Sequence, residues 1–369
     1  MPLFGPPDVG QLKANRDVKG LIKALGYNAD AGVRRAAAAA LGELGDPRAA
    51  EALVSALKSN EWQSDWHDTS AATDALVRLG AAAVGPLVEV LAWHSKVVRV
   101  SAAGALAAIG RPAIEPLIGL LGDSDLETRE TAGQILAEIG PDAGDALVAA
   151  LRDPAPGRRQ RAARALGEIG DPRAVAALCG ALGDPISGVR QTAARSLGEI
   201  ADPRAADPLA NALRDADPAV HKAAALSLAE IRDPRAVEPL LPEVWGPKPQ
   251  PAIDALVKVG EPAVGPMIAR LVDLRARGEE AWIVDEMRKG AAVVLGRLGY
   301  PEELAGLVAR LFSQDALERT AAVRELERLD ATSRLDERGR ALITALKPSI
   351  ELSGDDAASG DDTASDIAS

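Results

Sequence analysis

Few residues in this 369-residue sequence could act as nucleophiles or bases, because it contains one cysteine and three histidines. Cys179 lies in the apolar stretch Ala-Leu-Cys-Gly-Ala-Leu with no histidine nearby in sequence. Nucleophilic catalysis by a thiol requires an adjacent base. Neither standard glycine-rich phosphate loop occurs. These residues leave enzymatic activity open and favour a non-catalytic role.

The densest group of side chains that could bind a partner or a metal lies on two neighbouring segments near residues 60–95. It holds three of the five tryptophans and two of the three histidines: Trp62, Trp66, His67, Trp93 and His94. If the two segments are turns of adjacent stacked hairpins, about one helix spacing, roughly 10 Å, separates them. The group is interpreted either as an aromatic cap over a repeat junction or as a partner-binding hot spot, in which tryptophan is enriched. We take these five residues as candidate partner-binding residues.

A metal site is a third interpretation of the same group. His67, His94, Asp65 and Asp68 carry suitable ligand atoms. Two histidines without a fixed spacing are few ligands for a transition metal. We therefore predict no metal and no cofactor.

The elements that position these residues follow from an internal repeat. Six of nine steps between equivalent leucines are 30 or 31 residues; the column is Leu41, Leu76, Leu106, Leu136, Leu166, Leu197, Leu228, Leu256, Leu295 and Leu326. Seven residues before the leucine stand Arg34, Arg99, Arg129, Arg159, Arg190, Arg288 and Arg319, with His221 in an eighth repeat. The shared register of these columns predicts about ten copies of one structural unit.

Each unit is predicted to be a helical hairpin. Asp-Pro at 46, 171, 202 and 233 is typical of an N-cap followed by proline at the first helical position. Val189, Ala193, Leu197 and Ile200 have the spacing of one apolar helix face. A lone hairpin leaves that face exposed, so the units must stack. Ion pairs four residues apart are expected on the second helices: Asp74–Arg78, Arg164–Glu168, Arg195–Glu199 and Asp254–Lys258.

The motif Asp-Pro-Arg-Ala-Val-Ala-Ala-Leu, a turn, then Gly-Val-Arg-Gln-Thr-Ala-Ala-Arg-Ser-Leu-Gly-Glu-Ile resembles HEAT-repeat proteins of the phycobilisome-lyase HEAT-like type. The resemblance covers residues 12–347 and implies an all-α, armadillo-type fold: an α-solenoid (right-handed superhelix) of about ten HEAT-like hairpins. Residues 1–11 are then an N-terminal extension. Residues 348–369, rich in Gly, Ala, Ser, Thr and Asp, are predicted to be an acidic disordered tail.

The resemblance also implies a structural ladder between repeats, in which turn aspartates meet second-helix arginines. In this sequence the ladder residues are Asp123, Asp153, Asp184 and Asp215 with Arg129, Arg159 and Arg190. Because arginine also occurs in repeats that lack the aspartate, ligand contact by those arginines remains an alternative.

The same resemblance leaves function open between scaffolds, phycobilin lyases and deoxyhypusine hydroxylase. The hydroxylase binds iron through His-Glu pairs, and none of His67, His94 and His221 is followed by glutamate. The chemistry of the lyases is not visible as a compact sequence motif that could be looked for in this chain. We expect a non-catalytic protein-binding scaffold or assembly factor, with a lyase-like or hydroxylase-like enzyme as the alternative.

Charge and hydropathy narrow the choice of partner. The formal charge of −12 and the pI near 4.9 oppose nonspecific attraction to nucleic acid or anionic lipid. No signal-peptide pattern and no apolar stretch of about 20 residues occurs. We therefore expect a cytoplasmic protein that binds protein partners, with nucleic-acid binding and a purely structural role as less favoured alternatives.

Overall fold

The computed structural model describes residues 6–59, 66–246, 248–277, 280–331 and 336–346. These residues form α-helices, short 3-10 helices and turns, and none of them forms a strand. The predicted all-α stack of hairpins is thus confirmed. The predicted tail at 348–369 lies outside the described residues. The chain divides into two compact units, residues 1–196 and 197–369, within each of which the repeats pack.

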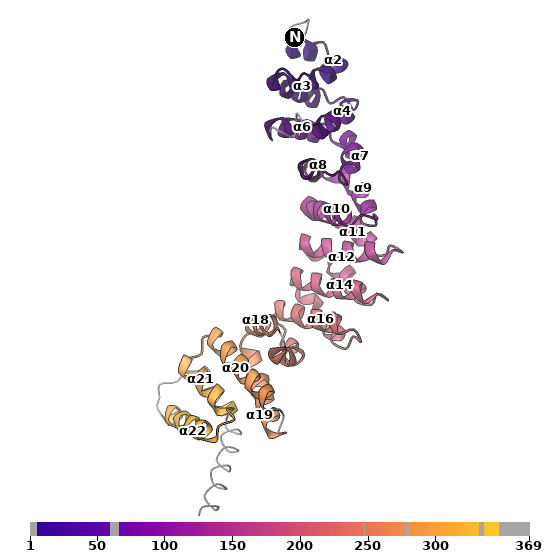
Figure 1. Cartoon of the computed structure of the whole chain (residues 1–369). Helices are drawn as coiled ribbons and strands as arrows, with labels where there is room; N and C mark the ends of the chain where they lie inside the picture. Colours follow the sequence, from indigo (N-terminus) through magenta and orange to yellow (C-terminus); the bar gives the residue numbers. More distant parts are fainter. Residues whose placement is uncertain (1–5, 60–65, 247, 278–279, 332–335, 347–369) are drawn as a thin grey trace, which may run out of the picture. The chain divides into compact units, whose positions relative to one another are not determined.

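The first unit has two layers of helices (Figure 1). The second helices of successive hairpins form one layer, in which α3 contacts α6, α6 contacts α8, α8 contacts α10, and α10 contacts α12. These are α3 (Ala31–Leu44), α6 (Trp66–Leu79), α8 (Lys96–Ile109), α10 (Leu126–Ile139) and α12 (Pro156–Ile169). The first helices form the other layer: α4 (Ala49–Lys58), α7 (Ala81–Glu89), α9 (Ile114–Leu120), α11 (Gly144–Ala150) and α13 (Val175–Ala181).

Two short helices, α1 (Val9–Ala14) and α2 (Val18–Leu25), precede this stack. Helix α1 therefore begins inside the segment that we predicted as an N-terminal extension. Helix α14 (Ser187–Ile200) crosses the division between the units.

The second unit continues the pattern of hairpins with irregular lengths. Its helices are α15 (Ala206–Ala212), α16 (Pro218–Glu230), α17 (Val237–Leu240), α18 (Gln250–Val259), α19 (Val264–Ala276), α20 (Ala281–Arg297), α21 (Glu302–Leu311) and α22 (Ala316–Ala331), and residues 337–346 are also helical. The short α17 passes into the 3-10 helix η6 (Leu241–Trp245) ahead of the proline-rich segment, because alternating prolines cannot continue a helix.

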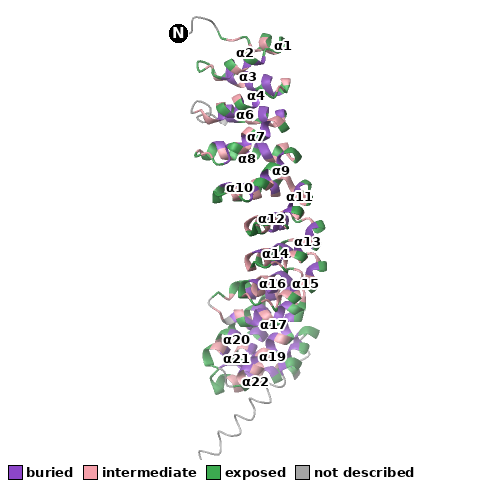
Figure 2. Ribbon diagram, turned by 90° about the vertical axis from the view of Figure 1, so that its right-hand side faces the viewer, coloured by how far each residue is buried: buried purple, intermediate pink, exposed green. Residues whose placement is uncertain are grey.

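The leucine column forms the centre of the core. All ten leucines lie on second helices and all are 0% exposed. Figure 2 shows buried residues on the inward sides of the helices and exposed residues at the ends of the hairpins. Small residues bring the second helices close together: a Cβ added to Gly42 would lie 2.8 Å from the Cα of Ala75. Complete burial of each leucine contributes about 1.5–3 kcal/mol.

The Asp-Pro motifs start the first helices through a 3-10 turn. Asp171, Asp202 and Asp233 each accept a hydrogen bond from the backbone N–H two residues later, and proline takes the first position of η3 (Pro172–Ala174), η4 (Pro203–Ala205) and η5 (Pro234–Ala236). The capping prediction is confirmed, although the α-helix itself begins three residues after the proline, where the 3-10 turn ends. The arginine after each proline also binds the capping carboxylate; Arg204 does so at 3.0 and 2.7 Å.

This Asp-Pro-Arg contact should be visible in an acid titration. Hydrogen bonds from Arg204 lower the pKa of Asp202 from 3.8 to about 2, and Arg48 does the same for Asp46. A lowered folded-state pKa adds stability above the unfolded pKa, and that stability disappears as the pH falls through the folded value. We expect Arg204→Gln to move the midpoint of Asp202 towards 3.8, measured by carboxyl carbon NMR, while Asp46 serves as the unchanged internal control. Equal midpoints for Asp202 in both proteins would contradict the contact.

Candidate functional site

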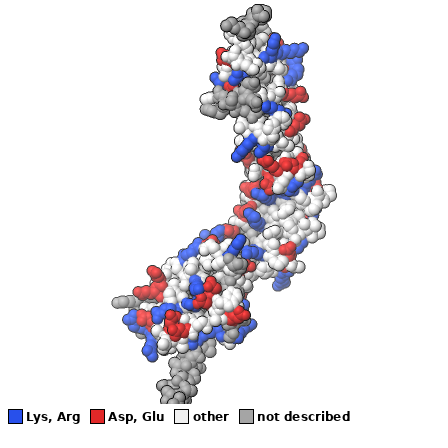
Figure 3. All heavy atoms as spheres, viewed as in Figure 1, with Lys and Arg blue, Asp and Glu red and all other residues white. Residues whose placement is uncertain are grey.

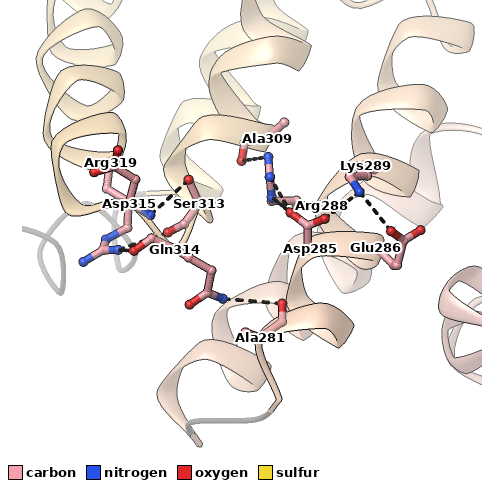
Figure 4. A network of polar contacts seen from close by, with 10 residues as sticks. All are labelled: Ala281, Asp285, Glu286, Arg288, Lys289, Ala309, Ser313, Gln314, Asp315 and Arg319. Atoms are coloured by element: carbon pink, nitrogen blue, oxygen red, sulfur yellow. Dashed lines mark hydrogen bonds and ion pairs between the residues drawn. The ribbon is translucent and has the colours of Figure 1, made fainter.

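Most arginines of the column close the turn inside their own hairpin; they are Arg99, Arg129, Arg159, Arg190 and Arg319. One Nη1 group donates to the two backbone carbonyls five and six residues earlier: Arg129 to Asp123 and Ser124 at 2.7 and 2.9 Å, and Arg319 to Ser313 and Gln314 at 3.0 and 2.8 Å. Figure 4 shows the Arg319 contacts. Arg99 makes the same bonds to Trp93 and His94 although its repeat lacks the turn aspartate. This role was not predicted from the sequence, where its signal was the constant distance between the arginine and the turn.

Two repeats depart from this pattern of turn contacts. His221 replaces the arginine, and its Nδ1 lies 2.7 Å from the carbonyl oxygen of Leu213. Arg288 instead binds Asp285 and the carbonyl of Ala309 on the next first helix, as Figure 4 also shows. The Arg164–Glu168 pair is confirmed at 2.9 Å. The Asp254–Lys258 prediction is wrong in detail, because Asp254 pairs with Arg297 and Lys258 pairs with Glu230, both from neighbouring repeats.

The predicted ladder residues lie in and beside the hairpin turns. Arg159 reaches the next repeat and binds Asp184 with two hydrogen bonds of 2.6 and 2.9 Å, which lower the pKa of Asp184. Asp153 contacts Arg158 at 3.1 Å. The four aspartates share a local role, since each accepts from the backbone N–H two residues later at 2.8–2.9 Å: Asp123, Asp153, Asp184 and Asp215. Arg190 donates to the carbonyls of Asp184 and Pro185.

The predicted tryptophan and histidine group is described only in part. Trp62 lies outside the described residues, and Trp66 is the first residue of α6, its side chain outside the description. Trp93 is half-buried, with the Lys58 Nζ 4.6 Å from its ring centroid and the His94 ring 4.8 Å away. We call Lys58, Trp93 and His94 the Trp93 cluster. His67 is exposed in the first turn of α6.

Asp68 holds the start of α6 against α3. The residue is 0% exposed, and both carboxylate oxygens are engaged. Arg34, itself 7% exposed, donates to Oδ2 through Nε at 3.1 Å and through Nη2, while Arg35 donates to Oδ1 at 3.0 Å. Asp68, one of the metal ligands considered above, is therefore an ion-pair acceptor. Among the described residues no group of three His, Cys, Asp or Glu side chains could hold a metal ion.

An open groove of about 640 Å³ lies between α6 and α8, which sit side by side in Figure 1. We call it the α6–α8 groove. Its walls are mainly apolar, and they come from one stripe on each helix: Thr69, Ser70, Thr73 and Asp74 on α6, and Lys96, Val97, Val100, Ser101 and Gly104 on α8. The turn that carries Trp93 and His94 leads directly into this stripe.

The α8 side of the groove exposes apolar side chains, whereas the apolar side chains on the opposite face of α8 are buried. Val97 is 45% exposed and Val100 is 61% exposed. One turn further, Gly104 has open space where a side chain would be, since a Cβ added there would meet no heavy atom within 4 Å. Aliphatic side chains on a concave surface are typical of a binding site. The groove was not predicted from the sequence, because valines on an amphipathic helix are expected in the core.

The charges at the groove are not neutralised by any residue that the structure describes. Asp74 and Lys96 are exposed, and neither forms an ion pair with any described residue. The predicted pair between Asp74 and Arg78 does not form; the described acidic neighbour of Arg78 is Glu43, at 3.9 Å. On the face drawn in Figure 3, acidic and basic side chains are intermixed. In the part of the chain that is described, no single helix has the length and apolar content to cross a membrane; only a pair bent by 117°, residues 96–109 with 111–120, meets those criteria together.

Three of the solved structures that are similar to this chain are each less than 25% identical to it. A complex of CpcE and CpcF of phycocyanin lyase from Nostoc sp. PCC7120 is 24% identical over 64% of this chain and 94% of the matched chain, with a TM-score of 0.35. Human deoxyhypusine hydroxylase is 24% identical over 68% of this chain and 96% of the hydroxylase, with a TM-score of 0.28. Kap121p is 13% identical over 88% of this chain and 42% of the Kap121p chain, with a TM-score of 0.48. No curated protein matches the sequence.

A family model of the repeat also matches this chain. The model for HEAT repeats matches residues 9–76, 84–160, 114–191, 144–216 and 182–245, which together exceed half of the chain. The matched ranges contain seven of the ten buried column leucines, the capping aspartates, and the turn-closing arginines Arg99, Arg129, Arg159 and Arg190. This protein therefore belongs to the family of HEAT-repeat proteins.

Proposed function

We propose that this chain is a non-catalytic protein-binding scaffold and that the α6–α8 groove, with the Trp93 cluster at the turn beside it, is a docking surface. The observation that carries the proposal is the exposure of Val97 and Val100 in a concave site of about 640 Å³. Val98 of the same helix faces the core and is buried, as are the equivalent Val189 and Val220 of later repeats.

The groove suits a macromolecular ligand better than a reacting small molecule. It is open along its length, its walls are aliphatic and hydroxyl-bearing, and its lining contains one carboxylate and one ammonium group and no histidine or cysteine. Proton transfer or nucleophilic attack requires an activated group in the site. An apolar floor with a polar rim is instead the arrangement found at protein interfaces.

The fixed positions of the two helices also favour docking of a rigid element. Helix α6 is held at its N-terminal end by Asp68, and α8 is held at its own N-terminal end by the Arg99 turn contacts. A partner that binds there displaces water from exposed valines without ordering the scaffold, so little conformational entropy is lost on the scaffold side.

Site-specific photocrosslinking tests the proposal. We expect p-benzoylphenylalanine at Val100 to crosslink one defined segment of a partner protein in native lysate, identified by mass spectrometry. Val293, a 45% exposed valine on the second helix α20, is the matched control and should not give that crosslink. Identical crosslinked species from both positions would show that the groove is not a specific docking surface.

A further inference from the structure

The two unpaired charges of the α6–α8 groove lie at different levels along it. Leu76 and Leu106 are equivalent residues of consecutive repeats, so Lys96 is level with the first residue of α6 and Asp74 is level with Gly104. Lys96 and Gly104 are eight residues apart on one helix, which corresponds to about 12 Å at 1.5 Å per residue. Val97 and Val100 occupy the interval between these two levels.

The polarity of the helices strengthens this separation. Lys96 is the first residue of α8, where the helix dipole adds positive potential. Asp74 lies two turns further along α6 and has no cationic partner among the described residues. The groove is therefore positive at its Lys96 end and negative at its Asp74 end, with apolar surface between.

From this arrangement, and resting on the proposed function, we infer that the groove binds an amphipathic helix with an aliphatic stripe flanked by one acidic and one basic residue about two turns apart. An α-helix places residues seven or eight positions apart on the same face at about 10–12 Å, which matches the spacing of the two groove charges. Aliphatic side chains at the intervening third and fourth positions would contact Val97 and Val100. Docking of a helix between two parallel helices is a recurrent recognition mode.

Charge complementarity sets which helices bind, while the valines supply the apolar contact. Each exposed ion pair contributes only about 0.2–1 kcal/mol. Two pairs together would therefore change affinity by a few-fold up to about thirtyfold. A helix with two acidic ends or two basic ends meets one repulsive contact and is disfavoured.

A displayed peptide library distinguishes the possibilities. The probe is a 16-residue helical frame with a fixed leucine stripe and flanking positions, two turns apart, randomised among Glu, Lys and Gln. We expect the unaltered protein to enrich peptides with one Glu and one Lys. Asp74→Lys should enrich peptides with two Glu, and Lys96→Glu should enrich peptides with two Lys. These expectations hold whichever way the helix runs along the groove.

The outcomes separate this inference from the proposed function. If all three proteins select the same peptide charges and Gly104→Leu abolishes capture, the groove binds helices but the charge rule is wrong. If no peptide is enriched, or if Gly104→Leu captures the same peptides, the groove is not a helix-docking surface and this inference fails. The Val100 crosslink, which does not depend on a helical ligand, then decides whether the proposed function fails as well.

Discussion

Replacing Asp68 by Asn is expected to lower the free energy of unfolding of the N-terminal repeats by about 3–5 kcal/mol. Arg34 is almost completely buried and its guanidinium binds this carboxylate, so the substitution leaves a buried cation without a counter-charge. Hydrogen–deuterium exchange of peptides from α3 and α6, together with urea unfolding, measures the loss. The local readout is needed because long repeat arrays do not always unfold in one transition.

Two further variants make the Asp68 prediction specific. Arg35→Gln removes the half-exposed partner and should cost less than about 1 kcal/mol, since surface pairs contribute little. The double variant Arg34→Met, Asp68→Leu removes both charges, and replacement of a buried pair by apolar residues is often neutral. We expect it to be more stable than Asp68→Asn alone. A double variant at least as unstable as the single one would contradict a role based on charge pairing.

Replacing Gly104 by Leu is expected to reduce partner binding at least about tenfold while preserving or raising stability. The new side chain enters the α6–α8 groove, where an added Cβ meets no neighbouring atom. Leucine is also the better helix former, by up to about 1 kcal/mol relative to glycine. The change is measured as crosslinking yield from Val100 and as melting temperature. Loss of binding combined with retained stability separates occlusion of the groove from unfolding.

Gly119→Leu is the matched control for Gly104→Leu. Gly119 is an exposed glycine inside α9 that does not line the groove, and a Cβ added there would also meet no heavy atom within 4 Å. Its replacement should leave crosslinking unchanged. Equal binding by the Gly104 and Gly119 variants would show that the partner docks elsewhere on the chain.

The repeat architecture was predictable because it depends on local and periodic features. A leucine that recurs every 30 or 31 residues must be buried in every copy if it is buried in one, and all ten are. Capping by Asp171, Asp202 and Asp233 was equally predictable, since the aspartate and the N–H that it accepts from are two residues apart. Such short-range contacts need no knowledge of which helices become neighbours.

The predicted site and the α6–α8 groove lie at the same repeats but consist of different residues. The tryptophan and histidine group pointed to the junction of α6 and α8, and the role of those five residues stays a prediction. The groove beside them is lined instead by valine, threonine, serine and glycine, which carry no signal of their own in the sequence. Asp68 was considered as a ligand only in the metal-site interpretation, which we did not adopt; its oxygens bind two arginines from α3.

What the sequence by itself determined is the repeating hairpin, its buried leucine face and its helix starts, because these depend on residues a few positions apart and on a regular period. Only the tertiary structure decided which polar groups meet: Arg34 with Asp68 across repeats, and Arg129 and its equivalents with the turn carbonyls of their own hairpins. It also decided which surfaces stay open, as at Gly104. The physical reason is that burial and pairing between helices depend on small offsets in packing, and the residue pattern of a single helix does not specify those offsets.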